Sequence, residues 1–192
     1  KELPSKALDE ILTDNAEIFT ELKEYYTQTS KPDTTKISFY EDTYSLYNLY
    51  RFAHYYEEAY GKYVWLKSGA SLVIEHTEAM TVIDVNTGSV LKKKKQEDTL
   101  FYQINREAAK EIARQLRLRN ISGIIMIDFI NMKDITQKEK LLTLLDNECK
   151  KDRVHCNVID MTALNLVEMT RSKVRKPLHE QVRSCMKKSN SL

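Results

Sequence analysis

The amino-acid sequence predicts an α/β protein, and two features of the second half of the chain carry that prediction. Residues 71–75 and 81–86 are rich in β-branched and aliphatic residues, and a short polar turn around Glu78 separates them, which is typical of an antiparallel hairpin. After residue 98 the apolar spacing alternates between that of helices and that of strands. This order of hairpin, helix, strand, helix and strand indicates a sheet joined by right-handed crossovers.

The first 63 residues are predicted to form short helices and one short strand. Residues 5–27 place apolar side chains at helical spacing, and residues 36–40 alternate like a short strand after the break at Pro32. A further helix is predicted between Leu46 and Tyr60, with tyrosines three or four residues apart. Those rings could stack nucleic-acid bases, but their spacing favours the packed face of an amphipathic helix.

The later part of the chain is predicted to form longer helices and strands. The longest helix is expected at 98–119, followed by a buried strand at 123–129, a helix at 137–151 and a strand at 154–161. The tail 171–188 holds seven basic residues and one acidic residue. The long helix has a stripe of apolar residues that should be buried: Leu100, Ile104, Ala108, Ile112 and Leu116.

The composition is that of an ordinary globular protein, with 42% hydrophobic and 30% charged residues. No run of residues is long and apolar enough to predict a membrane span. Three widely spaced cysteines suit reduced thiols in a cytoplasm better than a disulfide framework or a closed zinc site.

The charge is unevenly distributed, although the formal net charge is only +2. Residues 1–63 carry 12 acidic and 7 basic side chains, whereas residues 64–192 carry 16 acidic and 23 basic ones. A basic region beside an acidic one suits a polyanionic partner. Uneven solvation of two subdomains would produce the same pattern.

Three polar residues stand at the ends of the predicted strands and are the main candidates for chemistry. Asp84 and Asn86 point to the same face because side chains alternate along a strand, and Asp128 ends the strand after the crossover helix. Two carboxylates and an amide oxygen at such an edge suit Mg²⁺. Alternatively, the aspartates cap strands or helices. Asp160, at another strand end, is a third acidic candidate.

Basic residues could hold a polyanion near this edge, since contacts to phosphates give affinity without sequence preference. They could equally be solvated helix faces. No catalytic histidine pattern, nucleophile motif or phosphate loop competes with the acidic residues, and the four histidines are isolated along the chain. The basic candidates are Arg106, Lys110, Arg114 and Arg117 on the long helix, Lys92–Lys95 before it, and Arg171, Lys173, Arg175 and Lys176 after it.

Residues 68–75 read Ser-Gly-Ala-Ser-Leu-Val-Ile-Glu, residues 77–88 read Thr-Glu-Ala-Met-Thr-Val-Ile-Asp-Val-Asn-Thr-Gly, and residues 106–130 run from Arg-Glu-Ala-Ala-Lys-Glu-Ile-Ala to Met-Ile-Asp-Phe-Ile. These three segments resemble the catalytic region of the bacterial ribonuclease E/G family. The resemblance implies an endoribonuclease of the bacterial cytoplasm that needs Mg²⁺ and cleaves single-stranded RNA. It also implies a deoxyribonuclease I-like mixed sheet flanked by helices over 64–176. A small partial ribonuclease H-like subdomain would precede it at 1–63, and a basic tail would follow at 177–192.

The same resemblance assigns roles to particular residues. The metal-holding aspartates of the family fall on Asp84 and Asp128, and its catalytic asparagine falls on Asn86. These are the positions that strand geometry selects independently. For RNA binding we expect Lys110, Arg114, Arg117 and Arg171 to contribute.

The chain also departs from the family pattern. Asn131 stands where the family usually has an aspartate, which would weaken Mg²⁺ binding if that carboxylate supports the site from outside. The zinc motif Cys-Pro-x-Cys is absent around Cys185, so a zinc-linked dimer is not expected, while another homo-oligomer remains open. The family's OB-fold and 5′-phosphate sensor lie outside this sequence. A non-catalytic RNA-binding or scaffold module is therefore the alternative function.

Overall fold

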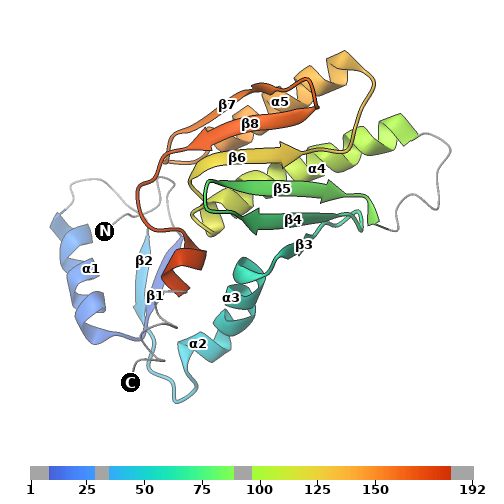
Figure 1. Cartoon of the computed structure of the whole chain (residues 1–192). Helices are drawn as coiled ribbons and strands as arrows, with labels where there is room; N and C mark the ends of the chain where they lie inside the picture. The colour runs from blue at the N-terminus through green and yellow to red at the C-terminus, as the bar shows by residue number, and fades with distance from the viewer. Residues whose placement is uncertain (1–8, 29–34, 89–96, 183–192) are drawn as a thin grey trace. The chain divides into compact units, whose positions relative to one another are not determined.

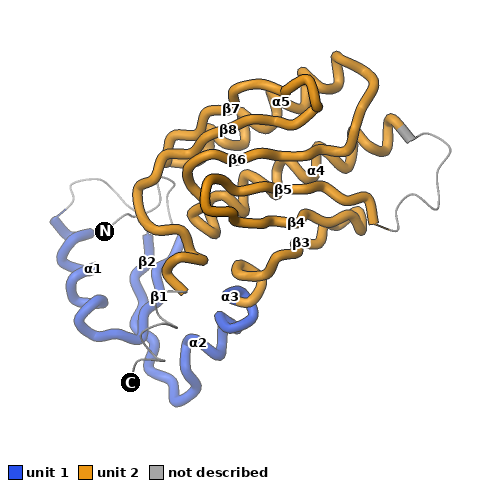
Figure 2. The backbone as a smooth tube through the Cα atoms, in the orientation of Figure 1, with its two compact units in different colours: residues 1–56 blue, residues 57–192 orange. Residues whose placement is uncertain are grey.

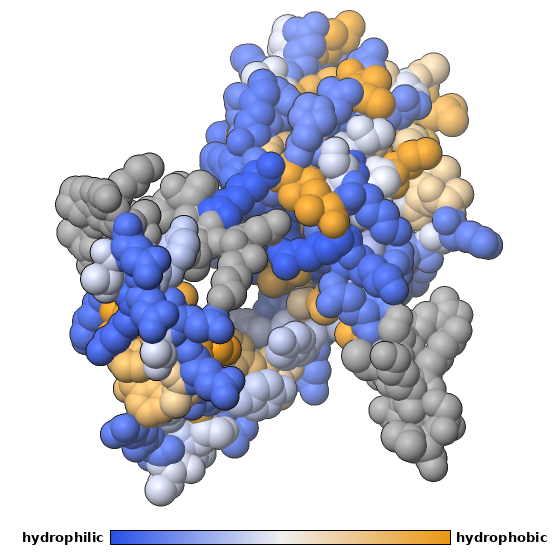
Figure 3. Space-filling model, turned by 90° about the vertical axis from the view of Figure 1, so that its left-hand side faces the viewer, coloured by the Kyte–Doolittle hydropathy of each residue, from blue (hydrophilic) through white to orange (hydrophobic). Residues whose placement is uncertain are grey.

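The computed structural model describes residues 9–28, 35–88 and 97–182, which form the elements labelled in Figure 1. The chain divides into two compact units, residues 1–56 and residues 57–192 (Figure 2). The surface in Figure 3 is mostly hydrophilic, with smaller hydrophobic patches. None of the helices in the described ranges is both long and apolar enough to cross a membrane.

The first unit contains a two-stranded parallel sheet. Strand β1, Glu10–Thr13, pairs with β2, Lys36–Phe39, and helix α1, Ala16–Gln28, packs against both. The prediction of a helix over residues 10–13 is wrong, because these residues pair with β2 and the helix begins only after Asn15. The Asn15 side chain accepts a hydrogen bond from the amide of Ile18 at 3.0 Å, which caps α1.

The predicted tyrosine-bearing helix is divided into two helices. Helix α2, Leu46–Leu49, is followed by α3, Phe52–Tyr60, in which Ala59 is the buried residue. Arg51 separates them with a φ of 50°, a left-handed conformation that ends the first helix. The expectation that the tyrosines form a packed face is wrong, because their rings are largely exposed. The exposed rings belong to Tyr47, Tyr50, Tyr55, Tyr56 and Tyr60.

The second unit is built on a six-stranded mixed sheet (Figure 1). The predicted hairpin is confirmed, since β4 and β5 are antiparallel with His76 opposite Thr81 at the turn. Strands β5 and β6 are parallel, as the crossover predicted. The strand order is β3 (Tyr63–Trp65), β4 (Ser71–His76), β5 (Met80–Asn86), β6 (Gly123–Asp128), β8 (Leu166–Arg171) and β7 (Cys156–Met161).

Helices α4, Glu97–Leu118, and α5, Ile135–Cys149, lie together along one face of this sheet (Figure 1). The predicted stripe of α4 is buried at all five positions, and it packs against alternate residues of β5 and β6. The α/β class with a mixed sheet and flanking helices is therefore confirmed.

The sequence analysis missed strand β8, as it missed the short strand β3. Leu166–Arg171 pairs with both β6 and β7, so it lies inside the sheet, whereas Arg171 was expected to open an exposed basic tail. The alternation of buried Val167 and Met169 with half-exposed Glu168 and Thr170 is the strand signal that was available in the sequence.

Candidate functional site

Asp84 and Asp128 lie directly beside each other in the sheet. They are register partners on the parallel strands β5 and β6, at the carboxyl end of each strand. Because Ile83, Val85 and Ile127 are buried beneath α4 and α5, the alternating aspartates point to the opposite face of the sheet. The structure therefore brings the two predicted carboxylates together.

Asn86 joins the pair from the end of β5. Its amide Nδ2 donates a hydrogen bond of 2.6 Å to Oδ2 of Asp84, so one carboxylate oxygen of Asp84 is held in place. Asn86 is also the register partner of Ser71, where β4 begins. The three predicted residues thus form one polar edge.

The electrostatics of this edge are those of two neighbouring carboxylates. Burial raises the pKa of Asp128 above its ordinary value, and the negative charge of Asp84 adds to the increase. Within the described residues, neither carboxylate forms an ion pair with a basic side chain. The same ranges hold no cluster of three or more His, Cys, Asp or Glu side chains suited to a metal. Two carboxylates without cationic partners fit Mg²⁺, which usually keeps several waters and takes its remaining ligands from substrate.

The backbone after Asn86 is held by a close approach of two glycines. Gly88 adopts a φ of +57°, and a Cβ at this position would lie 2.7 Å from the carbonyl oxygen of Gly69. Only glycine combines this conformation with this contact. The approach fixes the end of β5 against the loop that precedes β4.

Asn105 positions the segment after Asp128 and was missed in the sequence analysis. It is fully buried in α4; its Nδ2 donates to the carbonyl of Ile130 at 2.7 Å, and its Oδ1 accepts from the Ile130 amide at 3.0 Å. The available signal was that Asn105 falls at helical spacing with the apolar positions Ala108 and Ile112. With Ile130 held by these two hydrogen bonds, Asn131 is exposed between the buried residues Phe129 and Met132.

Asp160 does not belong to this edge. It lies on β7, and strand β8 stands between β7 and β6. Its Oδ1 accepts a hydrogen bond of 2.7 Å from the amide of Met161. The structure therefore separates this third candidate from Asp84 and Asp128.

The basic residues of α4 are exposed, as predicted. Arg114 is engaged in ion pairs with Glu111 at 2.9 Å and Glu58 at 3.4 Å, while Arg117 donates to the backbone carbonyl of Glu148 at 3.4 Å. Arg114 and Arg117 lie in the last turns of α4, which lead into the start of β6, whereas Asp128 ends that strand. Lys110 lies closer to the middle of the helix.

Arg171 differs from the other predicted RNA contacts. Arg171 is only 4% exposed. Its guanidinium forms an ion pair with Asp152 at 2.9 Å and donates hydrogen bonds to the Asn120 side chain and the Ile121 carbonyl. A buried guanidinium used in this way cannot reach a phosphate at the surface, so we leave Arg171 out of the RNA-contacting set. The predicted contacts at Lys92–Lys95 lie outside the described residues.

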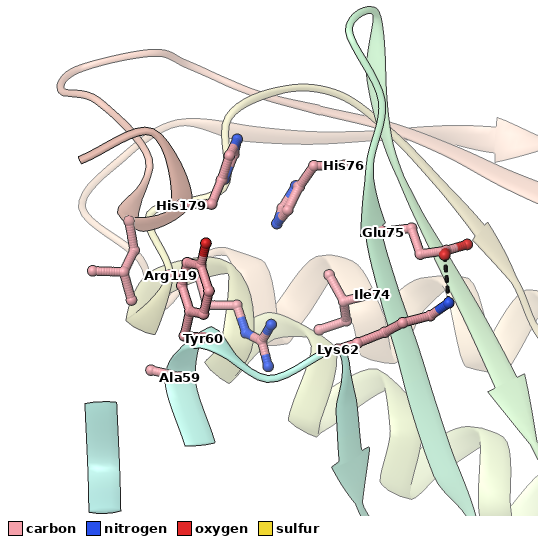
Figure 4. Close-up of a pocket in the computed structure, with 9 residues that line it drawn as sticks. Ala59, Tyr60, Lys62, Ile74, Glu75, His76, Arg119 and His179 are labelled. Atoms are coloured by element: carbon pink, nitrogen blue, oxygen red, sulfur yellow. Dashed lines mark ion pairs between the residues drawn. The ribbon is translucent and has the colours of Figure 1, made fainter. Parts of the chain in front are cut away.

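A pocket of about 280 Å³ lies at the other end of the sheet, where the hairpin turns (Figure 4). The rings of His76 and His179 stack there with centroids 3.8 Å apart, so these histidines are not isolated as the sequence suggested. Burial lowers the pKa of His76 to about 4, and the charges of His179 and Arg119 contribute. The guanidinium of Arg119 donates to the carbonyls of Gly61 and Glu58 near the end of α3, which gives it a structural role.

Taken together, the fold and the polar edge define an α/β protein whose mixed sheet presents a pair of carboxylates at the ends of two parallel strands. A family model described as the Ribonuclease E/G family matches residues 1–174. The chain belongs to this family.

Individual relatives support the same family assignment. Ribonuclease G of Escherichia coli strain K12 is 39% identical over 171 residues, which cover 89% of this chain and 35% of that protein. Ribonuclease G of Haemophilus influenzae is 40% identical over the same length. Ribonuclease E of Escherichia coli strain K12 is 34% identical over 174 residues, or 90% of this chain and 16% of that protein. The chain thus spans about a third of the length of the ribonucleases G that it matches.

Proposed function

We propose that this chain is the catalytic region of a Mg²⁺-dependent endoribonuclease that cleaves single-stranded RNA in the bacterial cytoplasm. The observation that carries the proposal is the adjacency of Asp84 and Asp128, at positions where the family resemblance expects its metal-holding aspartates. The names of the relatives support RNA as the substrate. The same resemblance supports a deoxyribonuclease I-like fold for residues 64–176 and a partial ribonuclease H-like fold for 1–63.

In the proposed reaction, Asp84 and Asp128 would hold the cation, and Asn86 fixes the orientation of the Asp84 carboxylate. When bound, Mg²⁺ supplies charge neutralisation at the scissile phosphate and lowers the pKa of attacking water. The apolar residues beneath the aspartates keep both carboxylates at one register position. Asn86 uses one of its two amide N–H groups on Asp84, so its other N–H and its Oδ1 are left to orient the attacking water or the scissile phosphate.

We assign binding of a part of the RNA strand distant from the cleaved bond to the exposed basic face of α4, because this helix covers the face of the sheet opposite to Asp84 and Asp128. Lys110 and Arg117 have no carboxylate ion-pair partner within the described residues, whereas Arg114 is paired with Glu111 and Glu58. A phosphate contact at Arg114 must therefore compete with two carboxylates. We expect Lys110→Glu and Arg117→Glu each to lower the log–log salt slope of RNA binding by about 0.7 or more. Arg114→Glu should change it less.

A cleavage assay on 5′-labelled single-stranded RNA with Mg²⁺ tests the proposal. Asp84→Asn and Asp128→Asn should each lower the cleavage rate by about 100-fold or more, as removal of one electrostatic group from a catalytic site typically does. Asp160→Asn is the matched control, because it removes a carboxylate from the same sheet but away from the pair. Full activity of either pair variant would refute the assignment.

The alternative is a non-catalytic RNA-binding module. Asn131 favours it, because this exposed position, three residues after Asp128, lacks the carboxylate that the family resemblance expects. Asn131→Asp should lower the Mg²⁺ concentration for half-maximal cleavage by about 10-fold if the position supports the metal. RNA binding without any cleavage by either form would establish the alternative.

A further inference from the structure

Three exposed aromatic rings gather in the first unit, where helix α2 gives way to helix α3 (Figure 1). We call Tyr47, Tyr50 and Phe52 the aromatic platform; these residues are 46%, 50% and 39% exposed. The centroid of the Phe52 ring lies 5.9 Å from that of Tyr47 and 6.1 Å from that of Tyr50, and the planes of Phe52 and Tyr50 differ by only 28°. The platform is therefore one set of neighbouring rings at the surface.

The break between the two helices creates this arrangement. In a continuous helix, residues two positions apart point about 200° from each other around the axis, so Phe52 could not lie beside Tyr50. Arg51 interrupts the helix with a φ of 50°, and its amide donates a hydrogen bond of 3.1 Å to the carbonyl of Asn48. The amide of His54 in turn donates to the Arg51 carbonyl at 3.0 Å. These backbone hydrogen bonds hold the turn that brings Phe52 back against the tyrosines.

The charge around the platform differs from that of its surroundings in the sequence. Residues 1–63 hold 12 acidic side chains, yet residues 45–56 contain none, while Arg51 and His54 lie among the aromatic residues. Arg51 is exposed and has no ion-pair partner within the described residues. Its guanidinium is therefore available to an anionic group that lies against the rings.

Exposed rings beside a cation have the chemistry of a site for single-stranded nucleic acid. Every base has a π-face, so stacking on aromatic side chains tolerates any sequence, and a nearby guanidinium adds a contact to the same strand. Bases in a duplex are already stacked on one another, so only unpaired bases can lie on such rings. A protein partner could also use exposed tyrosines, but a free guanidinium without neighbouring carboxylates, in an otherwise acidic part of the chain, favours a polyanion.

We propose that the aromatic platform binds unpaired bases of RNA by stacking, while Arg51 contacts a phosphate of the same strand. The proposal rests on the proposed function for the identity of the strand, because RNA is the substrate assigned to the acidic edge. None of the platform residues belongs to that edge, so the platform is a separate binding site. It selects single strands over duplexes without reading their sequence.

Fluorescence anisotropy with a fluorescein-labelled oligouridine, in EDTA, measures RNA binding without cleavage. Tyr50→Ala and Phe52→Ala should each raise the Kd by about fivefold or more, the effect expected from the loss of one stacked base. Tyr50→Leu and Phe52→Leu should weaken binding to a similar extent, because leucine keeps the apolar surface but not the flat ring. Leu49→Ala is the matched control: this exposed apolar residue lies in the same segment, and its truncation should leave the Kd unchanged.

Salt and strand state provide the second test. Arg51→Gln should lower the log–log salt slope of binding by about 0.7, because one phosphate contact is lost, whereas the ring variants should keep the slope of the parent protein. An RNA duplex should bind equally well to the parent protein and to Phe52→Ala. Circular dichroism verifies that each variant is folded.

The outcomes separate the proposal from its alternatives. An unchanged Kd in the ring variants, or no RNA binding by the parent protein in EDTA, would overturn it. If the alanine variants weaken binding but the leucine variants do not, the surface is an apolar docking face of the kind a protein uses. A dimer that light scattering finds in the parent protein but not in Phe52→Ala would assign the platform to a second copy of this chain. Full cleavage by Asp84→Asn would refute the proposed function without altering these binding results.

Discussion

The paired carboxylates predict an unusual result: removing one of them should stabilise the protein when no divalent cation is present. Asp84 and Asp128 are register partners on neighbouring strands, which lie about 4.8 Å apart. Two unit charges at that separation repel by about 1 kcal/mol in a water-like dielectric. Asp84→Asn removes this repulsion, but it also weakens the hydrogen bond from Asn86. The expected net gain in the free energy of unfolding is about 0.5 kcal/mol, within the range for like charges directly opposite in a sheet.

Urea denaturation at low ionic strength measures this gain, with Asp160→Asn as the matched control. In EDTA at pH 7 the Asp84→Asn variant should be more stable than the parent protein, and the control should not. In Mg²⁺ at ten times its dissociation constant the parent protein should gain about 1.4 kcal/mol, so the order reverses. Because burial and, secondarily, the charge of Asp84 raise the pKa of Asp128, protonation of this carboxyl at mildly acidic pH should also shrink the gain. A variant less stable than the parent in EDTA would show that the two charges do not face each other.

Three further predictions concern parts of the structure away from the charges of that pair. Gly88→Ala should lower the free energy of unfolding, measured by chemical denaturation, by about 2 kcal/mol more than Gly123→Ala does. Both positions have positive φ, but only at Gly88 would a new Cβ meet a backbone oxygen. Equal losses of stability would contradict this close approach. The pKa of His76 is lowered to about 4 in the folded protein, so as the pH falls the unfolded chain binds this proton before the folded protein does. The free energy of unfolding should therefore fall between about pH 6.5 and 4, by about 1.5 kcal/mol after allowance for solvent screening. Thermal melts of His76→Gln should depend less on pH over this range. Asp152→Ala should destabilise the protein by about 3 kcal/mol in urea, because it leaves the buried guanidinium of Arg171 without its carboxylate; a loss near zero would show that solvent reaches this pair.

The sequence was most informative where the spacing of apolar side chains matches the repeat of a helix or a strand. The stripe of α4 and the hairpin of β4 and β5 follow from apolar spacing alone, and strand alternation placed Asp84 and Asn86 on one face. The position of Asp128 beside Asp84 required only that β6 follow a crossover helix and pair in parallel. These are local rules, or rules about consecutive elements.

The misses depend on long-range pairing. Glu10–Thr13 becomes a strand because Lys36–Phe39, far along the chain, supplies its hydrogen-bond partners. The burial of Arg171 depends on Asp152 and on β8 entering the sheet between two earlier strands. The stacking of His76 on His179 likewise joins residues about a hundred positions apart. Propensity and spacing within a short window contain no information about such partners.

The place of β8 in the sheet has a consequence for how this protein is made on the ribosome. Strand β6 cannot complete its pairing, and β7 has no neighbour within the sheet, until residues 166–171 have left the exit tunnel. Until then the nascent chain presents β6 as an open edge with the apolar run Ile124–Ile127, the kind of edge that pairs with other chains. Translation that stops between β7 and β8 therefore releases a product prone to aggregation, whereas the six residues of β8 supply the strand that closes the edge. The synthesis of β8 is the step at which the sheet becomes self-contained.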